Sequence, residues 1–468
     1  MNICFLARPS FDRYSVAVLR NLRENHDTSI GGYFITSNEK ESLYIKNNIS
    51  NAVVCETSKF LRMYWNEFNL VRLAEFEEKY ECKPIWKYIY TDRFLINRSY
   101  EYVVKITVGL FSFFEDIFSK NEIDFYYSET IATLQCYIAY IVGKKYGVKY
   151  LAQMCARGSL DSVFHYFVKD EYQYNSRFDN DYKEIKYTEE EWIFADGILR
   201  KFEEKDCPPP AMQMVRTKPR MDKDFWLAPL KYIKKRFEKE FNDPYSYMYY
   251  LGYKNYLDPF VFYFHYKKTC KYYKDADFSK KYIYFPLHYQ PEASTCVCAE
   301  KYEKQIYFID SWAKSLPADT VLYVKEHYAL LGHRDPHFYI DLQKYPNVIL
   351  INPWESSRKL IENAAAVTTL TGTAGLEAML LRKPVFVCGN AVYENAPGII
   401  KVDEIYNNYV NNIEQWEKPS RDDIVKYLCA CIRSYSKGNA YAQNFYELID
   451  DNIDVLCNSL YEEMKNEM

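Results

Sequence analysis

The sequence predicts an α/β protein with two domains, each a parallel sheet covered by helices. Apolar and aromatic runs typical of strands alternate with helical segments before residue 160, and the same alternation returns after residue 281. With 468 residues, 48% of them hydrophobic, the chain is long enough to build two or three cores. We therefore expect two Rossmann-like domains that face each other across a cleft, with a helical middle region between them.

The first domain is expected to cover residues 1–186. Its predicted strands are 2–7, 31–36, 123–127 and 148–154, and its predicted helices are 15–25, 60–80 and 128–147. The region 187–278 loses the alternation. Its expected helices are 189–205, 228–241 and 257–274, the last two rich in aromatic and basic residues, with a break at the proline run 207–212. We interpret this region as a helical insertion between the domains.

The second domain is expected at 279–432. Its predicted strands are 281–287, 320–327, 347–352, 365–370 and 384–389, and its predicted helices are 299–315, 355–364 and 375–382. The final segment, 433–468, has apolar residues at helical spacing over 441–464. We expect this helix to pack back toward the first domain.

Composition excludes some classes of protein. Lys and Arg total 60 against 64 Asp and Glu, a net charge of -4 that argues against nucleic-acid binding. The start of the chain is not typical of a signal peptide, and no apolar run reaches 18 residues. The 13 cysteines show no metal-ligand spacing and predict reduced thiols in a cytoplasmic protein. The 48 tyrosines suit cores, carbohydrate surfaces or membrane interfaces, so a peripheral association with the inner face of the cell membrane stays open.

The stretch "TGTAG", Thr371, Gly372, Thr373, Ala374 and Gly375, stands between a predicted strand and a predicted helix. In open α/β sheets, ligands bind at this edge. Small residues let backbone amides approach an anion, and the positive end of the helix dipole favours negative charge. Helix capping alone is the alternative explanation.

Two more predicted strands end in polar groups. Lys325, Glu326 and His327 end the strand 320–327, and the strand 281–287 is followed by His288, Gln290, Glu292 and Ser294. Carboxyl ends of parallel strands meet at one edge of a sheet, so these groups and the 371–375 turn are expected to line one ligand site.

These stretches carry a family resemblance. "PLHYQPEAST", "LYVKEH", "TLTGTAGLEAMLLRKPVFVCG" and "APGI" resemble the bacterial capsule polysaccharide biosynthesis family, well over residues 281–400 and loosely over the first 160. That family contains GT-B transferases of the acidic sugar Kdo, which use a CMP-activated donor. The resemblance implies a GT-B glycosyltransferase of surface polysaccharide synthesis. It would transfer Kdo or another ulosonic sugar to a glycan or glycolipid acceptor, with the donor on the C-terminal domain and the acceptor on the N-terminal domain.

The resemblance also implies roles for single residues. His327 matches the family's His-Pro motif, which contacts the donor phosphate, although Tyr328 stands where proline is usual. The 371–375 turn would bind phosphate or the sugar carboxylate, and Glu377 would face the nucleotide.

Transfer from a CMP-sugar builds negative charge on the leaving phosphate. A histidine, Lys325 and helix-terminal amides could stabilise that charge without metal. Metal-binding transferases often use an Asp-x-Asp motif, but the two Asp-x-Asp stretches, at 179–181 and 275–277, lie away from predicted strand ends. We therefore expect no metal dependence and no cofactor. The sugar, the acceptor, the stereochemical outcome and the oligomeric state stay open.

The first domain supplies the candidate that acts on the acceptor. Glu129 follows the strand 123–127 and is expected at the start of a helix, where it could take a proton from the acceptor hydroxyl. A carboxylate placed there only by the helix dipole is the alternative. Arg8, at the end of the first strand, is expected to bind an acidic acceptor or the sugar carboxylate.

Two other functions fit the same residues. A polyol-phosphate transferase of the teichoic-acid type would use the same turn and the same histidine. A non-catalytic carbohydrate-binding subunit would bind the donor without turnover.

Overall fold

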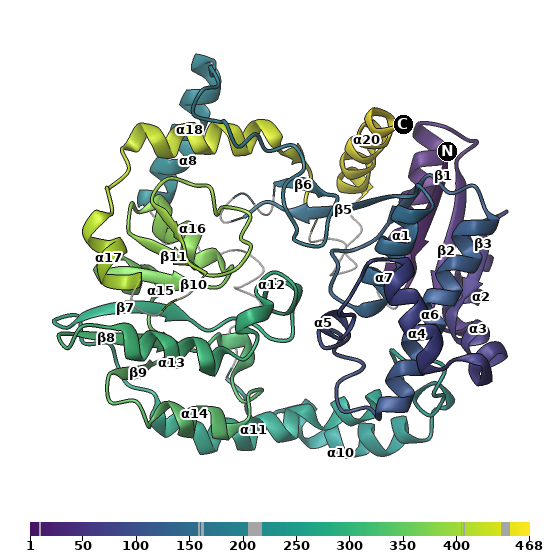
Figure 1. The fold of residues 1–468 in the computed structure, drawn as a ribbon, viewed down its shortest axis with the longest axis horizontal. Coiled ribbons are helices and arrows are strands. Elements are labelled where there is room, and N and C mark those ends of the chain that lie inside the picture. The colour runs from purple at the N-terminus through teal and green to yellow at the C-terminus, as the bar shows by residue number, and fades with distance from the viewer. Residues whose placement is uncertain are drawn as a thin grey trace.

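The computed structural model describes residues 1–8, 11–157, 160, 163–204, 218–403, 405, 408–440 and 450–468. It has two α/β lobes side by side, with α10 (Lys223–Arg236) and α11 (Asp258–Thr269) along one edge of the pair (Figure 1). One lobe is built on a seven-stranded sheet and the other on a six-stranded sheet. The predicted GT-B-like fold class, two Rossmann-like domains with parallel sheets, is confirmed.

The N-terminal sheet has the strand order β13-β6-β5-β4-β1-β2-β3. Its strands are β1 (Asn2–Leu6), β2 (Gly31–Thr36), β3 (Val53–Glu56), β4 (Phe125–Tyr127), β5 (Lys149–Cys155), β6 (Phe164–Val168) and β13 (Ser436–Lys437). The strands from β5 to β3 pair in parallel, whereas β6 runs antiparallel to β5 and to β13. The sequence did not reveal β3, β6 or β13.

The C-terminal sheet is parallel throughout, in the order β12-β11-β10-β7-β8-β9. Its strands are β7 (Lys281–Pro286), β8 (Thr320–Lys325), β9 (Val348–Ile351), β10 (Ala366–Thr369), β11 (Val385–Val387) and β12 (Ile399–Lys401). In both sheets the chain order reverses beside the first strand of the lobe, between β1 and β4 and between β7 and β10. Such switch points are where open α/β sheets bind ligands.

Helices surround both sheets. The N-terminal lobe has α1 (Phe11–Asn25), α2 (Glu39–Asn48), α3 (Thr57–Tyr64), α4 (Leu70–Lys79), α5 (Trp86–Ile89), α6 (Tyr100–Lys120) and α7 (Leu134–Lys145). The C-terminal lobe has α12 (Ala293–Cys296), α13 (Gln305–Ser315), α14 (Pro336–Leu342), α15 (Ser357–Asn363), α16 (Thr373–Leu380), α17 (Asn408–Gln415) and α18 (Arg421–Ser434). No helix among the described residues is both long and apolar enough to cross a bilayer.

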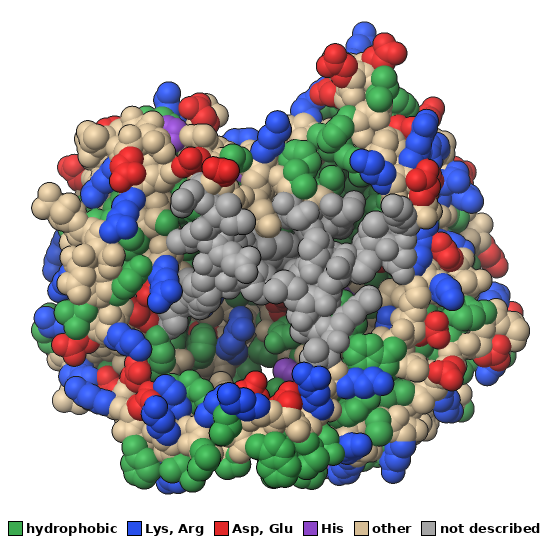
Figure 2. Space-filling view, turned by 180° about the vertical axis from the view of Figure 1, so that it is seen from behind, with side chains coloured by type: hydrophobic (Ala, Val, Ile, Leu, Met, Phe, Trp, Pro, Cys, Tyr) green, Lys and Arg blue, Asp and Glu red, His purple; other side chains and the backbone are tan. Residues whose placement is uncertain are grey.

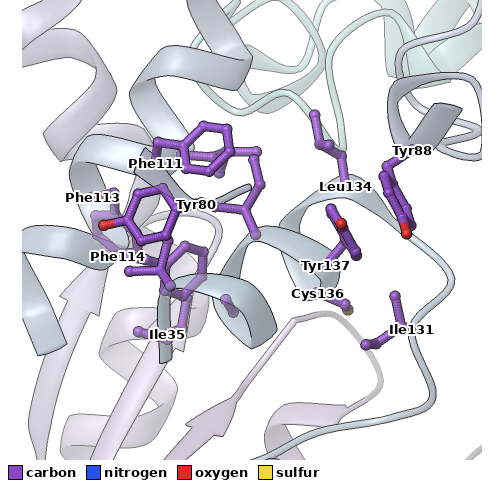
Figure 3. Close-up of a cluster of buried hydrophobic side chains, with 14 of the residues drawn as sticks. Ile35, Tyr80, Tyr88, Phe111, Phe113, Phe114, Ile131, Leu134, Cys136 and Tyr137 are labelled. Carbon is purple, nitrogen blue, oxygen red and sulfur yellow. The ribbon is translucent and has the colours of Figure 1, made fainter. Parts of the chain in front are cut away.

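The longest helix of the N-terminal lobe, α6, was not expected from the sequence. Its aromatic side chains enter a core that also contains Tyr80 of the segment after α4, and Tyr88 and Tyr137 stack face to face in the same core (Figure 3). Apolar residues lie on most sides of α6. A helix buried on several sides lacks the one-sided period that identifies a surface helix.

The helix after β4 also differs from expectation, because α7 begins at Leu134 and not at residue 128. The Thr133 side chain accepts a hydrogen bond from the amide of Cys136 and so caps the helix there. The six residues before it form a loop at the carboxyl end of β4. The predicted helix at 60–80 is likewise divided, into α3, a short 3-10 helix (Trp65–Glu67) and α4.

The middle region contacts both lobes. Helix α8 (Glu189–Glu204) packs on α18, and Arg421 pairs there with Asp196 and Glu203. Tyr247 and Met248 belong to the core of the N-terminal lobe, whereas α11 contacts α14 of the C-terminal lobe. The expected break at 207–212 lies outside the described residues.

Helix α20 (Asp450–Glu467) returns to the N-terminal lobe and lies against α1. Leu456, Cys457, Leu460 and Met464 share a core with β1 residues such as Ile3. Part of the helix expected from the sequence, 441–449, is outside the described residues.

Candidate active site

The switch point of the C-terminal sheet is held together by His288, which follows β7. Its Nε2 atom accepts a hydrogen bond from the amide of Thr371 at 3.3 Å and lies 3.0 Å from the Thr369 hydroxyl. The Thr369 oxygen accepts the amide of Gly372, so its proton is directed to His288. With Nε2 acting as acceptor, a neutral ring carries its proton on Nδ1.

The His288 ring is buried, which lowers its pKa to about 3, with Arg334 and His327 adding to the effect. Its Nδ1 atom is buried and has no hydrogen-bond partner among the described residues. The ring is therefore neutral at physiological pH, and its Nδ1–H is a buried donor without a partner among the described residues.

The glycines of "TGTAG" make room for protein side chains. A Cβ atom on Gly372 would lie 2.8 Å from His288 Nε2. A Cβ atom on Gly375 would lie 2.8 Å from the Thr369 methyl carbon and closer still to the Tyr393 hydroxyl, which donates to the carbonyl of Gly372. Close packing within the lobe is thus sufficient to explain both glycines.

Of the remaining donors in the turn, the Thr371 hydroxyl is used within the protein, whereas two backbone amides are free within the described residues to bind a ligand. The Thr371 hydroxyl donates to the carbonyl of Ser294 at 2.8 Å, so it is used within the protein. The amides of Thr373 and Ala374, at the start of α16, have no acceptor among the described residues, and Gly372 provides no side-chain cap. Thr373 and Ala374 are partly exposed. An anion at these amides would satisfy the free helix terminus.

Glu326 is occupied within the protein. Its Oε1 accepts the amide of His327 at 2.7 Å, and its Oε2 accepts the Arg334 Nε at 2.8 Å and the Tyr339 hydroxyl at 2.6 Å. The side chain is fully buried, and Arg334 also donates to the carbonyl of His288. Glu326 therefore fixes the loop after β8 and does not face a ligand.

His327 itself is positioned for hydrogen bonding. Its Nδ1 atom accepts the amide of Ala329 at 3.2 Å, which leaves the ring proton on Nε2. Burial, Arg334 and Lys325 together lower the pKa of His327 to about 4. The ring lies between Tyr289, at 6.1 Å, and Tyr328, at 5.1 Å between ring centroids. A neutral histidine here is a hydrogen-bond donor and not a cation.

Lys325 points into the protein. Its ammonium group donates to the carbonyl of Glu355 and the hydroxyl of Ser357, both at 2.7 Å. It therefore tethers the loop after β9 to the end of β8.

The loop after β7 is fixed in a similar way. Gln290 donates to the carbonyl of Glu303 at 2.6 Å, and Ser294 donates to the Glu292 carboxylate at 2.7 Å. Gln305 bonds both the amide and the carbonyl of His288 as well as Gln290. Glu292 is exposed at the start of α12, and Glu377 on α16 is partly exposed.

In the N-terminal lobe, Arg8 and Glu129 pair across the other switch point. Arg8 Nε donates to Glu129 Oε1 at 2.5 Å, and Nη2 donates to Oε2. Tyr150 donates to the carbonyl of Glu129 at 2.9 Å. Glu129 therefore lies in the loop before α7, five residues ahead of the helix, and not at the helix start. Its loop position and the bidentate pair replace the expected helix-dipole contact.

Three supporting residues were not found from the sequence: Arg334, Gln305 and Tyr393. None of them directly follows a strand, and no local motif marks them. They bond backbone and side-chain groups of residues that follow strands, so only the folded chain reveals them.

The described parts of the chain contain no group of three or more His, Cys, Asp or Glu residues that could hold a metal ion. Metal independence stays a prediction.

Two hollows adjoin these groups. A cleft of about 1060 Å³ lies between the lobes and is lined by residues such as Lys83, Tyr88, Cys296 and Lys304, and the Lys87–Glu300 ion pair, at 2.8 Å, connects the two lobes. A smaller pocket of about 410 Å³, lined in part by Tyr289 and Tyr328, adjoins the His327 ring.

Comparison with known proteins gives one family match. Residues 280–433 match the family model described as capsule polysaccharide biosynthesis protein. No curated protein matches the chain.

The solved structures that match the chain have low sequence identity and low TM-scores. A Thermosulfurimonas dismutans KpsC β-Kdo 2,4-transferase is 11% identical, with 68% of this chain and 82% of that chain covered and a TM-score of 0.35. The Methanocaldococcus jannaschii UDP-GlcNAc 2-epimerase bound to UDP-GlcNAc and UDP is 10% identical, with 91% and 98% covered and a TM-score of 0.27. These scores carry no conclusion about activity. The family match confirms the expected resemblance over residues 280–433, which form most of the C-terminal lobe and are similar to the capsule polysaccharide biosynthesis family.

Proposed function

We propose that the protein is a glycosyltransferase of bacterial surface polysaccharide synthesis. It takes a sugar, Kdo or another acidic ulosonic sugar, from a CMP-activated donor and transfers it to a glycan or glycolipid acceptor. The observation that carries this proposal is a set of free donors at the C-terminal switch point, in a lobe that matches a capsule polysaccharide family. The donors are the Thr373 and Ala374 amides and the Nε2–H of His327.

The donor phosphate fits this set by charge. Two amides at a helix start and a neutral imidazole N–H stabilise an anion by hydrogen bonds, and the helix dipole adds to their effect. As the bond from sugar to phosphate breaks, negative charge grows on the leaving CMP, so these bonds strengthen in the transition state. His327 acts here as a hydrogen-bond donor and does not give up its proton, because its pKa of about 4 keeps the ring neutral throughout.

Glu129 is the candidate that acts on the acceptor. Arg8 occupies both of its carboxylate oxygens. An acceptor hydroxyl that gives its proton to Glu129 must therefore share the carboxylate with Arg8 or displace it. The pair holds the carboxylate in one orientation at the switch point, which is the preorganisation that proton transfer requires.

The test is a donor screen with a matched histidine control. Thermal shift with CMP-, UDP- and CDP-linked donors should show stabilisation by the CMP-linked compound, because a ligand that binds only the native state raises the apparent melting temperature. His327→Ala should weaken donor binding or turnover more than about tenfold. His337→Ala, an exposed histidine of α14, should change neither.

Other outcomes separate the alternatives. Turnover of a CDP-polyol in place of a CMP-sugar would favour the polyol-phosphate transferase. Donor binding without turnover in the presence of acceptors would favour a carbohydrate-binding subunit. Equal loss of stability and activity in His327→Ala would make His327 a structural residue.

A further inference from the structure

Helix α10 presents an exposed apolar ridge that the fold does not use. Trp226, Leu230, Ile233 and Phe237 are 64%, 64%, 54% and 80% exposed. Their spacing of four, three and four residues places them on one face of the helix. We call these four residues the α10 ridge.

The opposite face of α10 packs against aromatic side chains of neighbouring helices. The Phe225 ring stacks on Phe260 of α11 with 5.0 Å between ring centroids and lies 6.2 Å from Phe264. Tyr232 contacts Tyr253 of the 3-10 helix η4 (Gly252–Leu257). Phe260 and Phe264 are themselves partly exposed, so the apolar surface continues from α10 onto α11. The helix therefore needs the ridge neither for its own packing nor for its contacts with the lobes.

Basic side chains accompany the ridge. Residues 223–271 contain ten Lys and Arg against five Asp and Glu, whereas the whole chain has a net charge of -4. Three of the acidic residues are already paired: Asp224 with Lys231, Glu238 with Lys235, and Asp243 with Arg62. The exposed cations Lys234, Arg236, Lys267 and Lys268 have no ion-pair partner within the described part of the chain. Figure 2 shows hydrophobic side chains with Lys and Arg around them along the lower edge of the molecule.

We propose that the α10 ridge docks the protein on an anionic lipid surface. A helix with large apolar side chains on one face and Lys and Arg beside them lies in the plane of a membrane interface. The apolar side chains enter the boundary between headgroups and acyl chains, and the cations pair with anionic headgroups. A second copy of the chain fits less well, because a two-fold contact would bring the same cations together.

The ridge lies on the connection between the lobes. Helix α10 contacts η4, which follows the segment that enters the N-terminal core, and α11 contacts α14 of the C-terminal lobe. A membrane bound at this edge would therefore hold both lobes at a fixed distance from the lipid.

Vesicle sedimentation tests the proposal without any substrate, so its outcome is independent of the proposed function. The full chain should bind vesicles of phosphatidylcholine that contain about 30% phosphatidylglycerol, an anionic mixture. It should bind pure phosphatidylcholine vesicles at least about tenfold more weakly, and salt should reduce binding to the anionic vesicles. Leu230→Ser combined with Phe237→Ser should lower binding to the anionic vesicles about tenfold or more. Ile193→Ser, which removes an apolar side chain 63% exposed on α8, should leave binding unchanged.

A charge variant adds a second measurement. Lys234→Glu combined with Arg236→Glu should also weaken binding to anionic vesicles while the melting temperature stays close to that of the parent. Equal binding by the ridge variant and the Ile193→Ser control would overturn the proposal. So would the absence of binding to anionic vesicles, or a dimer in sedimentation velocity that the ridge substitutions dissociate.

Discussion

Arg8 and Glu129 are far apart in sequence, yet each follows a strand beside the switch point of the N-terminal sheet and they form a bidentate pair. The pair parallels the contact of His288 with Thr369 and Thr371 in the other lobe. In both lobes a side chain that follows the first strand bonds the loop that follows the fourth. Each switch point is thus bridged by hydrogen bonds between a side chain that follows the first strand and the end or following loop of the fourth.

Replacement of Glu129 separates a catalytic carboxylate from a structural one. Glu129→Gln should lower kcat about a hundredfold or more, the scale of general acid–base catalysis, with donor affinity almost unchanged. Arg8→Gln also breaks the pair but leaves the carboxylate, so the two variants should lose similar stability and differ in kcat. Steady-state kinetics and melting temperatures measure both effects. A Glu129→Gln enzyme with near-normal kcat would leave Glu129 a partner of Arg8 only.

The lowered pKa of His288 predicts that the stability of the protein falls as the pH falls. Its folded pKa, about 3, lies below the unfolded value of about 6.5, so folding favours the neutral ring. That contribution is complete above about pH 6.5 and is lost as the pH falls toward about 3, at roughly 1.4 kcal/mol per pH unit within the window. The melting temperature of the parent should therefore fall faster than that of His288→Asn between pH 7 and pH 5. Groups that titrate in both proteins cancel in this difference, and parallel curves would contradict it.

At the scale of the element, the turn 371–375 connects sequence to packing. Gly375→Ala should destabilise the protein by about 1–3 kcal/mol, because the added carbon overlaps the Tyr393 hydroxyl and the Thr369 methyl group. Gly197→Ala on α8 is the matched control, since a Cβ atom there meets nothing within 4 Å. In that helix interior the change should be neutral or stabilising, by up to about 1 kcal/mol. Thermal or urea unfolding of both variants checks the prediction; equal effects would mean that the turn has room to relax.

The elements also show what could be predicted from the sequence. Five of the six strands of the C-terminal lobe were found because buried parallel strands are continuous apolar runs bounded by polar loops, whereas β12 was not predicted. β6 and β13 were missed because their pairing joins segments near residues 165 and 436, which no local pattern connects. α6 was missed because it is apolar on most sides. Likewise, strand-end residues such as His327 were predictable, whereas Arg334 and Gln305 support them from positions without a local signal.

Side-chain direction is also not visible in the sequence, and this limits the ligand-binding roles that can be predicted for Lys325 and Glu326. Lys325 ends β8 and Glu326 follows it, where a ligand-binding residue would lie. Yet Glu326 accepts bonds from Arg334 and Tyr339, and Lys325 donates to Glu355 and Ser357. A strand-end position selects residues near the crevice, and the direction of each side chain decides between ligand and framework.

At the scale of the whole molecule, catalysis is expected to proceed without metal. In the proposed function, the Thr373 and Ala374 amides and the neutral imidazole of His327 supply the stabilisation that a divalent cation would otherwise provide. Activity should therefore be the same before and after treatment with excess EDTA. A loss that Mg²⁺ or Mn²⁺ restores would contradict this expectation and require ligands not recognised in the sequence.

The position of α20 has a consequence for the order of folding during synthesis. A ribosome releases the N-terminal sheet early, but the apolar face that α20 covers, around Ile3 and Leu19, waits for residues 453–464. More than 250 residues of the C-terminal lobe and the bridging helices are made in between, and that lobe can complete its own core first. The N-terminal lobe is thus the last to close although it is the first to emerge, and a nascent chain should bind chaperones through this uncovered face until α20 arrives.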